Sequence, residues 1–183
     1  MNNKTDTATR IMDVAENYIR TQGYNGFSFR DISAEIGIKT ASIHYHFPSK
    51  EDLGAAVTKR YTERFLTGLG LPDAYPANEQ IERYKEAFRS SYAAGEQMCL
   101  CGMLGAEISS LPANLMLESK EFFQRNMTWL EEVFLSDQEK KNSPDIAQQK
   151  ALKLLALLEG GLIVSRSLGG LKTFDKLISN NND

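Results

Sequence analysis

Residues 28–53 decide the fold, and they read SFRDISAEIGIKTASIHYHFPSKEDL. Ser28 and Asp31 form an S-x-x-D capping box, which indicates the start of a helix. Gly37 is expected to end this helix, because glycine readily takes the left-handed conformation that closes helices. A second short helix is predicted directly after it, and Pro48 prevents its continuation. Two short helices joined by a glycine-centred turn are typical of a helix-turn-helix motif.

The second helix, predicted over 39–46, carries side chains that suit DNA. In a helix-turn-helix motif this helix enters the major groove by its N-terminal end, where small and hydrogen-bonding side chains approach bases and phosphates. Ile43 is the apolar residue expected to anchor the helix on the rest of the motif. The spacing alone fits a small helical bundle with a polar face equally well, so it leaves both interpretations open.

Two segments of this stretch, 28–32 and 37–53, resemble the DNA-binding domain of TetR/AcrR-family transcriptional regulators, and the resemblance covers about the first 60 residues. It implies an all-α, TetR-like fold with a three-helix helix-turn-helix DNA-binding domain over 1–50. A helical ligand-binding and dimerisation domain would follow over 51–183. The residues predicted to contact DNA are Ser28, Arg30, Lys39, Thr40, Ala41, Ser42, His44, Tyr45, His46 and Lys50.

The chain departs from the family pattern at two of these positions. Ala41 stands where many members have glycine, and the side chain of alanine leaves less room for the helix to approach DNA. His44 stands where many have tyrosine. Because histidine titrates near neutral pH, we hypothesise that the DNA affinity of this protein depends on pH.

Helical spacing continues beyond the motif, with helices expected near 78–96, 98–110, 113–136, 145–168 and 172–179. The run 145–168 is apolar around most of its circumference, which favours burial on nearly all sides. We expect 113–136 and 145–168 of two subunits to form a four-helix dimer interface. The alternative is a core helix within one chain, kinked at its two central glycines. The predicted interface residues are Phe122, Trp129, Leu154, Leu158, Gly161 and Leu162.

A ligand pocket is expected in the C-terminal part, lined by aromatic, sulfur-containing and acidic side chains. An aromatic stripe at helical spacing is also typical of an ordinary core, and Glu107 is also compatible with a solvated surface position. The predicted pocket residues are Tyr84, Phe88, Tyr92, Met98, Cys99, Met103, Glu107 and Trp129.

Cys99 and Cys101 are the two cysteines of the chain. We expect both to be free and buried, in a reducing compartment. The alternative is a redox- or electrophile-sensing repressor, because the segment 99–111 loosely resembles TetR members that respond to electrophiles. Zinc requires four ligands, and no partners for the pair are identifiable, so no metal site is predicted.

Charge is distributed unequally along the 183 residues, whose formal net charge is −3. Residues 1–60 hold 8 basic and 7 acidic side chains, and residues 61–183 hold 13 and 17. The acidic balance therefore belongs to the C-terminal part and does not argue against a DNA-binding N-terminal part.

Several classes of protein are disfavoured. No nucleophile elbow, P-loop or dinucleotide fingerprint occurs, so neither an enzyme nor a cofactor is expected. No signal-peptide pattern or membrane-spanning run is found, so a cytoplasmic protein without membrane contact is expected. The resemblance to TetR/AcrR regulators implies a homodimeric repressor that a small-molecule inducer releases from a palindromic DNA operator. The remaining alternative is a helical interaction protein without DNA binding.

Overall fold

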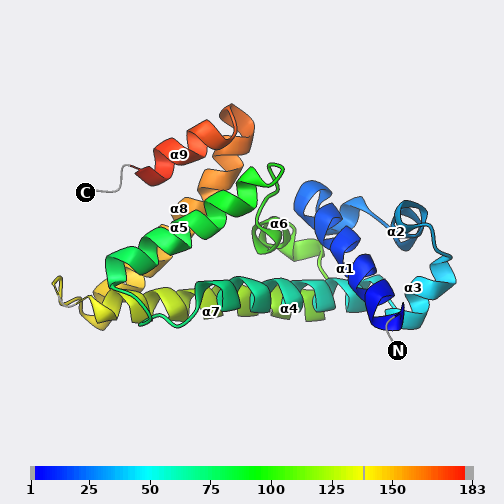
Figure 1. Ribbon diagram of the computed structural model, residues 1–183, viewed down its shortest axis with the longest axis horizontal. Coiled ribbons are helices and arrows are strands. Elements are labelled where there is room, and N and C mark those ends of the chain that lie inside the picture. The colour runs from blue at the N-terminus through cyan, green and yellow to red at the C-terminus, as the bar shows by residue number, and fades with distance from the viewer. Residues whose placement is uncertain (1–2, 138, 180–183) are drawn as a thin grey trace. The chain divides into compact units, whose positions relative to one another are not determined.

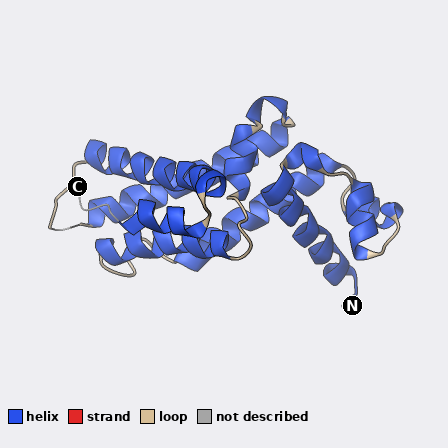
Figure 2. Ribbon diagram, turned by 90° about the horizontal axis from the view of Figure 1, so that it is seen from above, coloured by secondary structure: helices blue, strands red, loops and turns tan. Residues whose placement is uncertain are grey.

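The computed structural model describes residues 3–137 and 139–179, and every regular element in these ranges is a helix (Figures 1 and 2). This confirms the all-α prediction. No helix in the described ranges is both long enough and apolar enough to cross a membrane. The elements are α1 (Asn3–Gln22), η1 (Tyr24–Gly26), α2 (Phe29–Ile36), α3 (Thr40–His46), α4 (Lys50–Leu69), α5 (Ala77–Ala93), α6 (Leu100–Ala106), η2 (Ile108–Ser110), α7 (Ala113–Ser136), α8 (Pro144–Leu168) and α9 (Leu171–Ser179).

The chain divides into two compact units. Unit 1 comprises the residues up to Thr62 together with Leu100–Glu121, and unit 2 comprises Glu63–Cys99 and the residues from Phe122 onward. Helices α4 and α7 each contribute residues to both units. The segment that holds α6 and η2 therefore belongs to the same compact unit as the N-terminal helices.

Local sequence explains the start and end of α2. Ser28 Oγ accepts a hydrogen bond from the backbone N–H of Asp31, and the Asp31 carboxylate accepts one from the backbone N–H of Ser28 at 2.7 Å. Gly37 ends the helix with φ +71° and ψ +35°, the left-handed conformation that glycine adopts without strain. The predicted capping box and helix end are both confirmed.

A second capping box opens α4. The backbone N–H of Ser49 donates to the Asp52 carboxylate at 3.0 Å, and the backbone N–H of Asp52 donates to Ser49 Oγ at 3.1 Å. The helices of unit 1 then bury a set of fully covered apolar side chains, to which α1, α2, α3 and α4 all contribute. These are Ile11, Ala15, Ile19, Ile32, Ile43, Leu53 and Val57.

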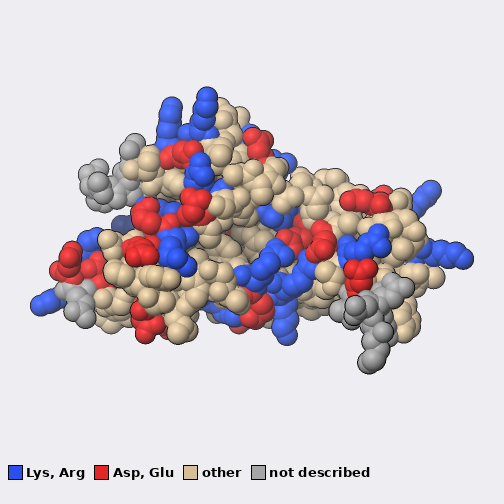
Figure 3. Space-filling model, in the orientation of Figure 1, with Lys and Arg blue, Asp and Glu red and all other residues tan. Residues whose placement is uncertain are grey.

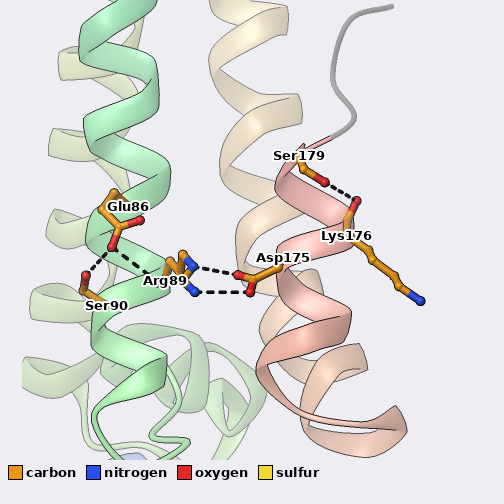
Figure 4. Close-up of polar contacts among 6 residues, drawn as sticks. All are labelled: Glu86, Arg89, Ser90, Asp175, Lys176 and Ser179. Atoms are coloured by element: carbon orange, nitrogen blue, oxygen red, sulfur yellow. Dashed lines mark hydrogen bonds and ion pairs between the residues drawn. The ribbon is translucent and has the colours of Figure 1, made fainter.

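In unit 2, α9 packs on α5 and α8. Arg89 of α5 donates to both carboxylate oxygens of Asp175 of α9, at 2.6 and 3.2 Å (Figure 4). The Phe174 ring is fully buried. A Cβ atom at Gly161 would lie 3.3 Å from that ring, so glycine allows α9 to approach α8 closely. The short C-terminal helix expected from the sequence is therefore a packed part of unit 2.

Two predicted helices have different ends in the structure. The helix expected over 78–96 stops at Ala93, because Gly95 has φ +124° and Glu96 has φ +55°. The helix expected over 98–110 is divided into α6 and η2 at Glu107. The backbone N–H of Glu107 bonds the carbonyl of Leu104 three residues earlier, which tightens the chain into a 3₁₀-type turn.

Candidate nucleic-acid interface and buried polar core

One face of α3 is open to solvent. Lys39, Ala41, His44 and Tyr45 are exposed, and Tyr45 keeps 67% of its surface accessible. Ile43 lies on the opposite face and is fully buried. The helix therefore presents basic, small and hydrogen-bonding side chains on one side, as a DNA-reading helix does.

The orientation of α3 is fixed by contacts with its neighbours. The hydroxyls of Ser33 and Thr40 lie 3.2 Å apart and share a hydrogen bond between α2 and α3. His44 Nδ1 lies 3.1 Å from the Pro48 carbonyl, and its ring packs edge-on against Phe29 with centroids 4.9 Å apart. Thr40 and His44 therefore hold the motif together as well as bordering its exposed face.

Ser28 and Lys50, two of the predicted DNA contacts, are engaged within unit 1. The Ser28 hydroxyl donates to the Asp31 carboxylate at 2.6 Å, and these hydrogen bonds lower the pKa of Asp31. Lys50 Nζ donates to the carbonyl of Phe27 and lies 4.5 Å from the ring centroid of Tyr24. Partial burial lowers the pKa of Lys50. A phosphate would have to compete with these internal partners.

Two arginines of unit 1 are engaged by other parts of the unit. Arg60 pairs with Asp13 at 2.8 Å and with Glu16 at 3.0 Å, and Arg10 donates to the backbone carbonyl of Ile36. Arg30, another predicted DNA contact, is exposed like Lys39. Ser42 and His46 are half-buried. Figure 3 shows basic and acidic side chains interspersed over the displayed face.

Glu107 has a place that sequence reasoning missed. Its Oε2 atom accepts hydrogen bonds from the backbone N–H of Tyr24 at 3.1 Å, from the backbone N–H of Asn25 at 3.4 Å and from the Asn25 side-chain amide at 3.3 Å. A Cβ atom at Gly23 would lie 1.8 Å from Glu107 Oε1. Glu107 thus ties the α6–η2 segment to the turn after α1, within unit 1. No local sequence pattern signals this contact, because its donors are mostly backbone groups.

The predicted pocket residues separate between the two units. Met103 and Glu107 belong to unit 1, whereas Tyr84, Phe88, Tyr92, Met98, Cys99 and Trp129 belong to unit 2 and are buried there. Both cysteines are free thiols. In the described part of the chain, no three His, Cys, Asp or Glu side chains are grouped so that they can hold a metal ion.

An aromatic cluster surrounds Tyr84 in unit 2. The Tyr84 ring stacks on Trp129 with centroids 5.6 Å apart and an interplanar angle of 23°. Phe65 and Phe88 pack against it at 5.7 and 5.5 Å. The Tyr84 hydroxyl donates to Asn126 Oδ1 at 2.7 Å, and burial raises the pKa of Tyr84 well above its usual value. Three of the predicted pocket residues therefore form one packed group.

Glu159 of α8 is the second group that the sequence analysis missed. Its Oε1 atom is buried and has no hydrogen-bond partner among the described residues. Burial raises the pKa of Glu159 from 4.5 to about 7, although a hydrogen bond from the Cys99 thiol lowers it. Its charge also raises the pKa of Tyr84, so the carboxylate borders the aromatic cluster. The signal available in the sequence was a single carboxylate within the apolar run of 152–164.

The predicted interface residues are buried within the single chain, and an interface at these positions stays a prediction. They are Phe122, Trp129, Leu154, Leu158, Gly161 and Leu162. The exposed side of α8 carries other residues at helical spacing. These are Leu152, Ala156 and Ile163, with Leu152 59% and Ile163 54% accessible. A Cβ atom at Gly160, on the same side, would meet no atom within 4 Å.

Known proteins share both the N-terminal sequence and the whole fold. Residues 11–57 match the family model of bacterial regulatory proteins of the tetR family. A TetR transcriptional regulator from Legionella pneumophila is 36% identical with a TM-score of 0.88, covering 97% of this chain and 95% of that chain. A TetR-family regulator from Agrobacterium tumefaciens is 30% identical with a TM-score of 0.88, covering 96% and 95%.

A shorter match lies in a protein described as an uncharacterised HTH-type transcriptional regulator in the dhlA 5′ region of Xanthobacter autotrophicus. It is 33% identical over 58 residues, which are 32% of this chain and 29% of that protein. That relative therefore supports the N-terminal motif, and the two solved structures extend the likeness to the whole chain.

Proposed function

Because the chain belongs to the TetR family of bacterial regulatory proteins, we propose that it is a homodimeric repressor that leaves a palindromic DNA operator when a small molecule binds unit 2. The exposed face of α3, held in place by contacts with α2 and with the turn after it, carries this proposal. Residues 1–50 act as the DNA-binding domain and residues 51–183 as the regulatory domain.

In this proposal α3 enters the major groove. Lys39, Ala41 and Tyr45 face the bases and flanking phosphates, and Thr40, Ser42 and His46 border them. Arg30, Ser28 and Lys50 add contacts to the phosphate backbone. The two α3 helices of a dimer would lie about 34 Å apart, one helical turn of DNA, as in other helix-turn-helix dimers.

The exposed side of α8 is the proposed contact with a second copy of the chain. Leu152, Ala156 and Ile163 form an apolar stripe, and the open space beside Gly160 allows a partner helix to approach closely. Dimerisation belongs to the family fold, and an exposed stripe of this kind loses its contact with water when two such helices pair.

In this proposal the regulatory signal reaches unit 1 along the chain. Helices α4 and α7 each contribute residues to both units, and Glu107 ties the segment before α7 to the turn after α1 within unit 1. A ligand can shift the protein toward a state that does not fit the operator only if it binds that state more tightly.

The test is a gel-shift titration of the full chain on the DNA upstream of its own gene. Wild-type protein is expected to bind, with an affinity that falls steeply between 50 and 200 mM salt because phosphate contacts release counterions. Tyr45→Ala should lower the affinity at least about tenfold, since each dimer loses two DNA contacts. Tyr75→Ala, which removes another exposed tyrosine, should leave it unchanged. A flat salt response, or equal effects of the two variants, would refute the proposal.

A further inference from the structure

The core of unit 2 contains a carboxylate without a counter-charge. Among the described residues, Glu159 forms no ion pair, and its buried Oε1 atom accepts no hydrogen bond. A buried acceptor that is left unpaired costs about 1–3 kcal/mol, and more when it is charged. The fold therefore keeps an unfavourable group at this position, and such a group calls for an explanation, for which a bound partner is one candidate.

The basic side chains of unit 2 do not supply the missing partner. Three of these basic side chains form ion pairs with other carboxylates. The pairs are Lys85 with Glu82, Arg89 with Asp175 and Arg125 with Glu63. The Cys99 thiol contributes a hydrogen bond to Glu159 but no positive charge. What Glu159 lacks is thus a cation that also carries a hydrogen-bond donor.

The surroundings of Glu159 favour an organic cation over a hydrated metal ion. The charge of Glu159 adds to burial in raising the pKa of Tyr84, and Phe65, Phe88 and Trp129 pack around Tyr84. Aromatic faces attract cations that have shed their water, whereas Mg²⁺ and Ca²⁺ require several oxygen ligands. One unpaired buried carboxylate in a unit with such an aromatic cluster therefore fits a protonated amine with an apolar body.

Glu159 combines a covered atom with a partly exposed residue. The residue as a whole is half-buried, whereas its Oε1 atom is covered. The Tyr84 ring is fully buried.

We propose that unit 2 binds an organic ammonium ion, whose N–H group donates to Glu159 and whose apolar body packs beside the Tyr84 cluster. This inference rests on the proposed function, because it names the chemical class of the inducer. A carboxylic acid would be repelled by Glu159, and a neutral alcohol would supply the donor without the charge.

The test uses three probes of similar size: 2-phenylethylamine, 2-phenylethanol and 3-phenylpropionate. Trp129 is the single tryptophan of the chain and stacks on Tyr84, so its fluorescence reports binding to the full-length protein. The amine should bind at least about tenfold more tightly than the alcohol, and more tightly still than the acid. Equal affinities of the amine and the alcohol would overturn the inference.

Glu159→Gln keeps the shape of the side chain and removes its charge. This variant should bind the amine no better than the alcohol. Glu139→Gln makes the same change at an exposed position in the loop before α8 and should keep the wild-type preference. An amine preference that survives in Glu159→Gln would overturn the assignment of this residue.

A measurement on the wild type alone makes the test independent of how well the variants fold. At pH 7 about half of the Glu159 groups carry a proton, so binding of an ammonium ion should release about half a proton per site. Calorimetry in two buffers of different ionisation enthalpy measures this release. Amine binding without proton release would contradict the role of Glu159.

The same preparations separate this inference from the proposed function. Operator binding without any amine binding would overturn the inference and leave the regulator intact. Amine binding that depends on Glu159, in a protein that binds no operator DNA, would support the site and refute the proposed function.

Discussion

Replacing Glu159 by glutamine should make the stability of the protein less dependent on pH. In the folded chain the pKa of Glu159 is raised from 4.5 to about 7, so the folded state holds the proton more tightly than the unfolded state. The stability contributed by the protonated acid is therefore complete below pH 4.5 and is lost as the pH rises through about 7. The separation of these two values corresponds to about 3 kcal/mol. Glutamine does not ionise and escapes this loss.

The assay is urea unfolding of wild type and Glu159→Gln at pH 5 and pH 8, followed by Trp129 fluorescence at one fixed protein concentration. From pH 5 to pH 8 the free energy of unfolding of the wild type should fall by about 2–3 kcal/mol more than that of Glu159→Gln. The other ionisable groups are present in both proteins, so their contributions cancel in this comparison. A difference between the two proteins that is the same at both pH values would refute the reasoning, and Glu139→Gln should show no such change.

Three further predictions concern contacts elsewhere in the fold. Glu107→Ala should destabilise unit 1 by about 2–3 kcal/mol in urea unfolding, because it leaves several N–H donors unpaired, whereas Glu107→Gln keeps an acceptor and should cost less. Asp175→Asn should lower the free energy of unfolding by less than about 1 kcal/mol, since its ion pair with Arg89 is partly exposed. Phe174→Ala should lower it by about 3–5 kcal/mol, because the ring is fully buried. Equal shifts in the melting temperature of the two variants would contradict this ranking. Ile163→Asp should give monomers in analytical ultracentrifugation, whereas Leu168→Asp, which changes an exposed leucine on the other side of α8, should remain dimeric.

The parts of the fold that were predicted correctly are those that local sequence controls. The Ser28–Asp31 capping box and Gly37 set the limits of α2 through contacts among residues that are close in sequence. The expected range 113–136 agrees with α7 because apolar spacing and a preceding proline define it locally. The prediction of one continuous helix over 98–110 was wrong, because the helix is interrupted at Glu107, whose side chain binds the turn after α1. That contact joins residues more than 80 positions apart, and periodicity carries no information about it.

The proposed sites show the same limit. Periodicity indicated that α8 is apolar on most sides, but it did not show which sides the chain itself covers. Phe174 lies against Gly161, so the side of α8 that holds this glycine is filled by α9. The neighbouring glycine, Gly160, has open space and marks the other side. Glu159 could have been singled out from the sequence as a charge in an apolar run, but only burial shows that its Oε1 atom lacks a partner.

The internal engagement of basic side chains in unit 1 makes dimerisation central to the proposed DNA binding. Arg60 is paired with two carboxylates, and Lys50 already donates one hydrogen bond to a backbone carbonyl, so a phosphate would compete with these internal partners. Within 28–46, whose residues the structure all describes, Arg30 and Lys39 are the exposed Lys and Arg side chains. Joining two such weak surfaces in one rigid dimer makes the second contact effectively intramolecular, which raises the affinity without any new side chain. It follows that Ile163→Asp, although it lies in unit 2, should weaken operator binding more strongly than removal of Lys39 from each subunit.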